Sequence, residues 1–411
     1  MDKNRVLIIG GGPSGLLTAH ILNKLSIPYT LFEQDSDISS RAPDWDFGIH
    51  WTQSSLPACL PRHITYEKLK AAQVDPGLDP AKDDFLPVFN LSTGEEMHRI
   101  NMPFVMRLRR SQFMKLLREG LGDVRYGKRL SAINTDYDHV VTATFTDGTI
   151  EHGTLLIGTD GAQSVVRNFL FSSDPAKAAL KPSRIVSRTV ITTLPPHAVD
   201  NIRALDKRMS IGHHPGGIFA WFGSHECPPN VPSSKWKYTL MMSRKEPLHI
   251  PADQGGPGVL ERAKGIARIR FCEPFRSIWE AVPEGAQVWC NRLSSWPTEE
   301  WDNRNGRVTL VGDAAHPMLP HCGQGLNSAI QDVARLSECL RFHYHPNPNP
   351  DRKVLGPFKK ALDVYEKELW KRGRDAVIMS DENAEAVHDW ERLRMSPLWR
   401  FGIRPVDDLC A

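Results

Sequence analysis

The chain has 411 residues, of which 40% are hydrophobic and 24% charged, and 51 basic against 48 acidic side chains give a formal net charge of +3. This is the composition of an ordinary soluble protein, long enough for two domains or one large discontinuous one. The near-balance of charge gives no electrostatic reason to expect nucleic acid or an anionic membrane as a partner. No apolar stretch approaches the roughly 18 residues of a membrane span.

The first elements predicted along the chain form a β-α-β unit. Residues 5–9 (RVLII) read as a buried strand, glycines follow, residues 14–25 carry a helical pattern, and residues 28–33 (PYTLFE) form a second strand. Two strands joined by a helix are expected to be parallel neighbours in one sheet. A helix at 110–121 and a buried strand at 154–158 extend the same pattern.

A different kind of sheet is predicted after about Pro182. Residues 184–194 are rich in β-branched side chains, residues 209–222 suit a hairpin around residues 215–217, and residues 236–242 alternate between polar and apolar. Such alternation is typical of antiparallel strands.

The chain then returns to buried-strand character at 307–311 (RVTLV), followed by a helix at about 324–342, a proline-rich break at 346–350 and a helical tail. The antiparallel segments therefore read as an insertion between parts of a parallel-sheet domain.

The seven cysteines are scattered, odd in number and without a CxxC pair. Neither a disulfide framework nor a zinc site is predicted, and each cysteine is expected to be a small buried hydrophobe. This usage favours a reducing compartment, and we expect a cytoplasmic protein with no bound metal.

A glycine loop follows the first strand. Gly10, Gly12 and Gly15 satisfy GxGxxG, in which the glycines allow a tight turn, close approach of a pyrophosphate and close packing of the next helix. Glu33 ends the second strand, where a carboxylate accepts hydrogen bonds from a ribose diol and repels a 2′-phosphate. An ordinary strand-to-helix turn is the alternative interpretation. In this context the loop predicts a site for FAD or NAD rather than NADP.

A second cofactor segment lies about three hundred residues further on. Residues 312–317 (GDAAHP) follow a buried strand, and Pro320, Gly323-Gln324-Gly325 and Asn327 come next. A carboxylate at a strand end suits a ribityl chain, and glycines let the backbone lie against a flat ring. Two contacts so far apart in the chain favour the long FAD molecule over a nicotinamide dinucleotide.

These segments resemble a known family. GGGPSGL at residues 10–16, GTDGAQSVVR at 158–167 and GDAAHPMLPHCGQGLNSAIQD at 312–332 are together similar to the single-component aromatic-hydroxylase class of FAD-dependent monooxygenases. The resemblance covers residues 5 to 395, and DWDFGIHW at 44–51 is similar to a form found in fungal members from secondary metabolism.

With this resemblance, the pattern of elements predicts an α/β fold with a Rossmann-type FAD-binding domain, an inserted antiparallel-sheet substrate domain and a helical C-terminal tail. We expect the FAD-binding domain in residues 1–75, 100–180 and 290–345. The substrate-binding domain is expected in residues 76–99 and 181–289, and the tail in residues 354–411.

The resemblance also implies which residues bind FAD. The expected contacts, from the ADP half to the flavin ring, are Gly10, Gly12, Ser14, Gly15, Glu33, Arg41, Arg110, Asp160, Asp313, Gly323, Gly325, Leu326 and Asn327. Arg109 is adjacent to Arg110 and is the competing choice for that role. Asp160 also suits a helix N-cap for the segment that follows it, and the two roles are compatible.

Catalytic side chains are harder to predict. Pro320, expected beside the flavin, and His316 are the candidates, although a motif histidine beside two alanines is more readily structural. His213 and His214 have no third ligand at metal-binding spacing, so a surface or pocket position is expected. Core packing is the default for Trp221, Trp289 and Trp296, with pocket lining as the alternative for one or two of them.

The implied reaction is oxygenation. NADPH or NADH reduces non-covalently bound FAD, molecular oxygen reacts with it, and one oxygen atom hydroxylates or epoxidises a small aromatic or polycyclic natural product. An FAD-dependent oxidase or dehydrogenase on the same fold is the alternative, and a non-enzymatic flavin-binding protein a more distant one. A monomer or homodimer is expected. The sequence leaves the substrate, its site of oxidation and the choice of nicotinamide cofactor open.

Overall fold

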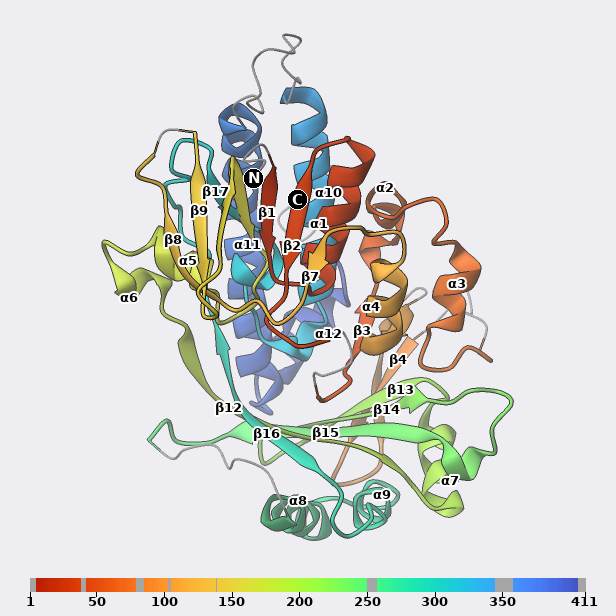
Figure 1. The fold of residues 1–411 in the computed structure, drawn as a ribbon. Helices are drawn as coiled ribbons and strands as arrows, with labels where there is room; N and C mark the ends of the chain where they lie inside the picture. Colours follow the sequence, from red (N-terminus) through yellow and green to blue (C-terminus); the bar gives the residue numbers. More distant parts are fainter. Residues whose placement is uncertain are drawn as a thin grey trace.

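The computed structural model describes residues 5–37, 42–78, 85–102, 105–137, 139–249, 257–343 and 358–405. Two sheets, one above the other in Figure 1, organise the chain. The upper sheet has five strands whose neighbours all run parallel. Their order is β17 (Val308–Leu310), β11 (Leu155–Gly158), β1 (Val6–Ile9), β2 (Tyr29–Phe32) and β7 (Val124–Arg125).

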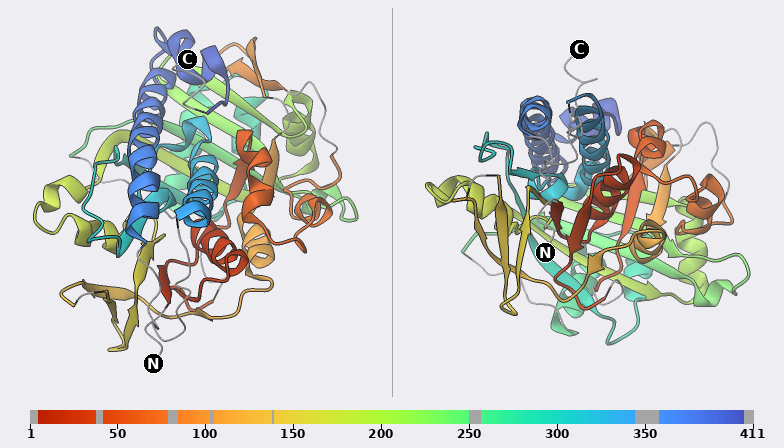
Figure 2. Two further views of the ribbon diagram at one scale, coloured as in Figure 1. Left: turned by 90° about the horizontal axis from the view of Figure 1, so that it is seen from above. Right: turned by 45° about the horizontal axis from the view of Figure 1, so that its top comes forward.

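The upper sheet is buried because both of its faces are covered. All four residues of β1 are at most 4% exposed, as expected for a short apolar strand in a parallel sheet. Helices α1 (Pro13–Lys24), α10 (Gly325–His343) and α11 (Lys359–Val387) lie beside one another on one side (Figure 2). An antiparallel meander packs on the sheet through Phe145 and Phe32, and it comprises β8 (Leu130–Asn134), β9 (Val141–Phe145) and β10 (Ile150–Gly153).

The lower sheet has seven strands. Their order is β16 (Val288–Ser295), β12 (Lys181–Thr193), β15 (Lys237–Lys245), β14 (Ile218–Glu226), β13 (Met209–His214), β4 (Phe85–Asn90) and β5 (Glu96–Asn101). The hairpin expected around residues 215–217 joins β13 to β14. The sheet is antiparallel except for the parallel pair of β13 and β4. A parallel pair needs a long connection between its strands, and β4 and β13 are far apart in the sequence.

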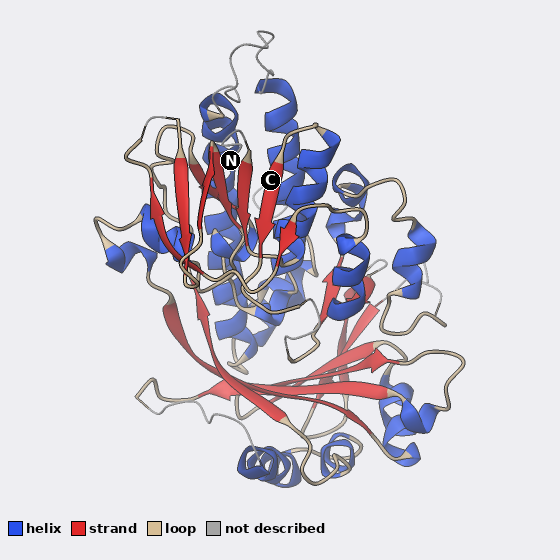
Figure 3. Ribbon diagram, viewed as in Figure 1, coloured by secondary structure: helices blue, strands red, loops and turns tan. Residues whose placement is uncertain are grey.

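The lower face of the seven-stranded sheet is covered by α7 (Pro196–Leu205), α8 (Pro257–Arg270) and α9 (Phe275–Glu280), as Figure 3 shows. Val190, Phe222 and Leu240 point into this core and are fully buried. Since side chains alternate along a strand, the intervening residues face the upper half of the molecule.

Shorter elements connect the two sheets. Strand β3 (Asp46–Ile49) pairs with β6 (Met106–Arg109) in an antiparallel ribbon. The remaining helices are α2 (Leu56–Cys59), α3 (Tyr66–Ala71), α4 (Arg110–Arg118), α5 (Val165–Leu170), α6 (Pro175–Ala178) and α12 (Pro397–Phe401).

Helix α11 reaches both halves of the molecule. The Tyr365 hydroxyl donates to Leu310 O of the parallel sheet, and Val387 packs with Ile211 and Phe219 of the seven-stranded sheet. Over the described ranges, no helix is long and apolar enough to cross a membrane. The predicted α/β fold with an inserted sheet and a helical C-terminal region is confirmed.

Candidate functional site

The GxGxxG motif runs from the β1–α1 loop into the first turn of α1, and its glycines Gly10 and Gly15 are crowded whereas Gly12 is open. Gly10 has φ +107°, and a Cβ there would lie 2.4 Å from Thr159 O, while a Cβ on Gly15 would lie 1.9 Å from Gly10 O. A Cβ on Gly12 would meet no atom within 4 Å. Gly12 is also the N-cap of α1, and no side chain caps it. The loop therefore leaves space at an uncapped helix N-terminus, as a phosphate site requires.

Glu33 lies against this loop. Its Oε2 accepts from Gly11 N at 2.5 Å, and its Oε1 accepts from Asp35 N at 2.8 Å. A Cβ on Gly11 would lie 3.0 Å from the Glu33 carboxylate. The acidic residue expected at a ribose is therefore held beside the glycine loop.

The second motif meets the first. Gly312 begins the 3₁₀ turn η3 (Gly312–Ala314) with φ +68°, and a Cβ there would lie 2.3 Å from Ser14 Oγ. Asp313 is exposed, and its Oδ1 is 3.8 Å from the position of a Cβ on Gly325 at the start of α10. The fold thus brings Ser14 and Asp313 to one edge of the parallel sheet.

The Gly323–Gly325 segment is fixed to β3 by one amide. Asn327 Oδ1 accepts from His50 N (2.8 Å) and Thr52 Oγ1 (2.9 Å), and its Nδ2 donates to Gly48 O and Gly323 O at 3.0 Å each. These four bonds use every donor and acceptor site of the side chain. Only the backbone of Asn327 is left for a cofactor. Pro320 is exposed at the start of the adjacent turn η4 (Pro320–Cys322).

Asp160 caps α5. Its carboxylate accepts from Val165 N (2.7 Å), Val166 N (3.1 Å) and Ser164 Oγ (2.5 Å), although Ser164 is the N-cap itself. Burial raises the pKa of the Asp160 carboxyl, and these hydrogen bonds oppose the rise. The side chain of the preceding residue, Thr159, contacts Gly10, so Asp160 lies beside the glycine loop in space.

The two adjacent arginines have different partners. Arg109 forms ion pairs with Glu226 (2.5 Å) of the seven-stranded sheet and with Asp44 (3.5 Å). Arg110 begins α4, where its backbone N donates to Trp45 O at 2.8 Å. The competing choice, Arg109, is therefore engaged between the two halves of the molecule. Arg41 lies outside the described residues.

His316 belongs to a buried group that we call the paired network: His316, Asp332, Arg372 and Glu368. The imidazole is fully buried, and its Nε2 lies 2.6 Å from Asp332 Oδ2, which also accepts from Gly312 N at 2.7 Å. Arg372 donates to Asp332 Oδ1 at 2.8 Å and to Glu368. Burial would raise the pKa of Asp332, but the charges of His316 and Arg372 outweigh it and lower that pKa. This buried environment favours the structural interpretation of His316 over the catalytic one.

Three other histidines form a second buried group, which we call the histidine cluster: His213, His321, His388 and the hydroxyl of Ser243. Ser243 Oγ lies 3.1 Å from His321 Nε2 and 2.8 Å from His388 Nε2, and His213 Nδ1 lies 3.2 Å from Val387 O. Burial lowers the pKa of all three imidazoles, to about 3 for His213 and about 4 for His388. His213 is therefore buried rather than on the surface, because the upper face of β13 packs against α11. Its neighbour His214 is half-buried and accepts from Gly216 N within the hairpin.

The three tryptophans separate into two groups. Trp296 is 1% exposed and its indole donates to Lys177 O, so core packing is confirmed for it. Trp221 and Trp289 are only half-buried. Sequence periodicity identified their strands but not the face on which each ring lies.

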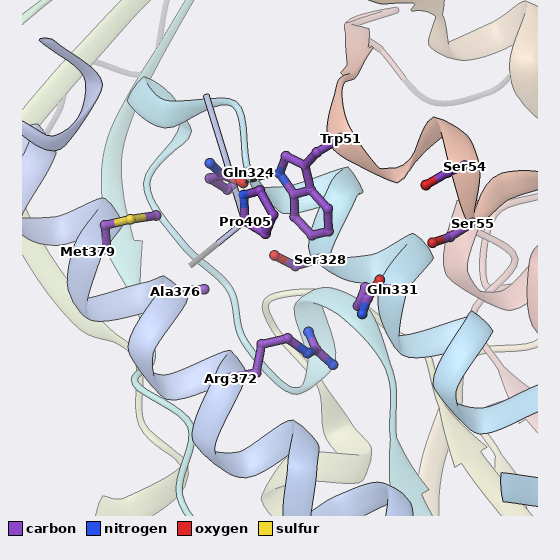
Figure 4. A pocket seen from close by; sticks show the side chains of 10 residues that line it. All are labelled: Trp51, Ser54, Ser55, Gln324, Ser328, Gln331, Arg372, Ala376, Met379 and Pro405. Carbon is purple, nitrogen blue, oxygen red and sulfur yellow. Dashed lines mark hydrogen bonds between the residues drawn. The ribbon is translucent and has the colours of Figure 1, made fainter. Parts of the chain in front are cut away.

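A cavity of about 210 Å³ lies between α10, α11 and the 3₁₀ turn η1 (Trp51–Ser54). Its walls include Trp51, Gln324, Ser328 and Gln331, with Arg372 of the paired network at its base (Figure 4). None of the residues predicted to bind FAD lines this cavity. Within the described ranges, no group of three or more His, Cys, Asp or Glu residues is arranged to hold a metal ion.

Known proteins share both the motifs and the fold. Residues 8–59 match a model described as an NAD(P)-binding Rossmann-like domain, and residues 279–350 match one described as an FAD binding domain. The FAD-dependent monooxygenase cctM of Talaromyces islandicus is 41% identical over 403 residues, which cover 98% of each chain. This chain belongs to the FAD-dependent monooxygenases.

A second relative, the FAD-dependent monooxygenase phnB of Penicillium herquei, is 32% identical over 98% of this monooxygenase and 96% of its own length. The solved structure of 2,6-dihydroxypyridine-3-hydroxylase from Arthrobacter nicotinovorans superimposes with a TM-score of 0.73, at 17% identity and covering 98% of each chain. At that identity it shows the shared fold alone. The predicted family, its FAD cofactor and its NAD(P)H co-substrate are confirmed, and the oxidase alternative is not favoured.

Proposed function

We propose that FAD lies extended from the glycine loop to the Gly323–Gly325 segment of this monooxygenase. The pyrophosphate lies at Gly12 and the N-terminus of α1, the adenosine ribose at Glu33, and the ribityl chain at Asp313. The main support for this position of the pyrophosphate is that Gly12 alone of the three motif glycines borders open space. The residues present fit the cofactor, because a Cβ on Gly12 would fill the place of a phosphate.

The flavin ring is proposed to lie beside Pro320, with its pyrimidine edge at the backbone of residues 325–327. Arg110 supports the cofactor from the start of α4, Arg41 from the preceding segment, and Asp160 from the end of β11. Bound FAD accepts electrons from NADPH or NADH and reacts with molecular oxygen. The protein binds and orients the ring and excludes water from the reacting edge.

We propose that the substrate is a small aromatic or polycyclic natural product that is hydroxylated or epoxidised. Support comes from the fungal relatives and from the half-buried aromatic residues on the seven-stranded sheet. The enzyme is proposed to act in the cytoplasm, as a monomer or homodimer. Cys59, Cys227, Cys272, Cys322 and Cys339 are free thiols, which suits a reducing compartment.

We also propose a division into an FAD-binding domain (1–75, 100–180 and 290–345), a substrate-binding domain (76–99 and 181–289) and a C-terminal tail (354–411). Separate hydrophobic clusters support it: one contains Val6, Ile157 and Ile330, and another contains Val190 and Trp279.

Two matched glycine variants test the cofactor position. Gly12→Ala is expected to fold normally, since its φ of −70° suits alanine and its Cβ meets no atom within 4 Å. It is expected to weaken FAD binding by about 100-fold or more, because the methyl group occupies the phosphate position. Gly15→Ala is expected to destabilise the fold itself, since its Cβ would lie 1.9 Å from Gly10 O.

The measurements are the unfolding temperature of each apoprotein and the FAD dissociation constant from flavin fluorescence. A Gly12→Ala protein that binds FAD as tightly as the wild type would show that the pyrophosphate lies elsewhere.

A further inference from the structure

The upper face of the seven-stranded sheet carries a row of four side chains, of which Trp289, Met241 and Trp221 are only partly buried and Thr189 is 6% exposed. Trp289, Thr189, Met241 and Trp221 are paired directly across the neighbouring strands β16, β12, β15 and β14. Side chains opposite one another on adjacent strands share a face. We call these four residues the floor row.

Coverage differs sharply between the two faces of these strands. On the lower face, Val190, Leu240 and Phe222 are completely buried, whereas Trp221, Met241 and Trp289 of the floor row are only partly buried. Large apolar side chains left open in a row mark a surface that binds an apolar molecule.

The floor row lies next to the turn that carries Pro320 and next to the segment that leads to β3. On one side, Ser243 lies two residues from Met241 on the same face of β15 and contacts His321, which directly follows Pro320. On the other side, the Trp45 ring, next to β3, meets the Trp289 ring in an edge-to-face contact at 5.9 Å between centroids. A flat molecule on this row is therefore flanked by η4 and by the segment leading to β3.

A cationic side chain beside the floor row, Arg107, is already compensated by partners in the protein. The Arg107 guanidinium lies 4.7 Å from the centroid of the Trp221 ring, but it forms an ion pair with Asp46 at 2.8 Å. It also donates to Ser224 O at 2.9 Å and Arg208 O at 3.1 Å. A substrate carboxylate would have to displace these partners.

The polar groups along the floor row are hydroxyls. Thr189 belongs to the row, and its Oγ1 lies 3.5 Å from Ser187 Oγ. Thr239, two residues before Met241 on the same face, has a buried Oγ1 without a hydrogen-bond partner among the described residues. Hydroxyls donate to and accept from uncharged phenol and carbonyl groups.

Building on the proposed function, we propose that the floor row is the base of the substrate pocket and selects a flat, uncharged aromatic molecule that carries hydroxyl or carbonyl groups in preference to an aromatic carboxylate. Stacking on the indoles supplies the binding energy, and the hydroxyls fix the orientation.

The test uses the FAD-loaded enzyme and two probes of matched size, 2-acetyl-1-naphthol and 1-hydroxy-2-naphthoate. Binding is measured at pH 7 without NADPH, from the change each probe causes in the absorbance of bound flavin. The acetyl compound is expected to bind at least about tenfold more tightly. Equal or tighter binding of the carboxylate, or no binding of either probe, overturns the proposal.

Two variants locate the probe. Trp289→Leu and Trp221→Leu are each expected to weaken binding of 2-acetyl-1-naphthol about tenfold while leaving the FAD content unchanged. Trp390→Leu, at a 36% exposed position, is the matched control and is expected to bind the probe as the wild type does. Trp289→Leu keeps the test decisive if Trp221→Leu, which also loses its contact with Arg107, does not fold.

Wild-type affinity in Trp289→Leu would overturn the position of the floor row. A wild-type enzyme that cannot be loaded with FAD would instead contradict the proposed cofactor site, so the two failures are distinguishable.

Discussion

The paired network and the histidine cluster are both buried, and they accommodate histidine in opposite ways. In the paired network the imidazole meets a carboxylate that an arginine also neutralises, so charges are compensated within the protein. In the histidine cluster His321 and His388 share the Ser243 hydroxyl, His213 contacts Val387 O, and burial lowers the pKa of all three imidazoles, so they remain uncharged. The fold therefore buries histidine in two ways, once against a carboxylate and once without a charged partner in hydrogen-bond contact.

The largest expected effect follows from breaking the paired network. Asp332→Asn removes the charge that Arg372 faces and weakens the acceptor of Gly312 N, so we expect a loss of about 3–5 kcal/mol in the free energy of unfolding. The loss is measured by urea denaturation. Asp363→Asn is the control, because Asp363 lies on the exposed side of α11, the helix that carries Arg372, and pairs with Lys359. Equal losses in the two variants would mean that Arg372 does not depend on Asp332.

The histidine cluster predicts a pH effect of intermediate size. As the pH falls below the ordinary histidine pKa of about 6.5, the unfolded chain takes up protons while these buried imidazoles remain neutral. The stability of the native state is therefore complete above about pH 6.5, and each histidine lowers it by up to about 1.4 kcal/mol per pH unit down to its folded pKa.

His388→Asn is expected to make this decline shallower by one proton between pH 6.5 and about 4, the pKa of His388. His197→Asn, on the exposed surface of α7, serves as the control. The slope of unfolding free energy against pH measures the difference. A slope that His388→Asn leaves unaltered would show that His388 is not neutral in the native state.

The smallest expected effect concerns catalysis by His316. Because the ring is fully buried against Asp332, His316→Asn is expected to lower the free energy of unfolding by about 1–3 kcal/mol. The pH dependence of kcat/KM is expected to keep its shape. Loss of an ionisation from that profile, with stability unchanged, would instead assign His316 an acid-base role.

The cofactor motifs were predictable from sequence because local backbone geometry dictates them. Gly10 and Gly312 have positive φ, and a Cβ at either position would clash with neighbouring atoms. Because only glycine is tolerated there, the glycines in the sequence reveal these backbone positions. Arg110 was predicted as the cofactor contact from its place at the start of a helix, but the ion pair of Arg109 with Glu226 was not predictable, because Glu226 reaches Arg109 from a distant strand.

The side of the seven-stranded sheet on which each side chain lies could not be predicted from the sequence either. Alternation predicted the strands, but register decides that Trp221 and Trp289 share a face. The meeting of His321 and His388 depends on two elements far apart in the chain. The parallel pairing of β4 with β13 has the same origin, since no local pattern specifies a partner.

Helix α11 contacts both halves of the enzyme and so helps to fix the distance between them. Its 29 residues span about 44 Å at 1.5 Å per residue. Arg372 in its middle anchors Asp332 behind the Gly312 turn, and Val387 at its end packs with Ile211 and Phe219 on the same face of the seven-stranded sheet as the floor row. The distance between the Gly312 turn and the floor row, within which a substrate would lie, therefore depends on the length of helix α11. Removing a single turn would shift one wall against the other by about 5.4 Å, more than the thickness of an aromatic ring.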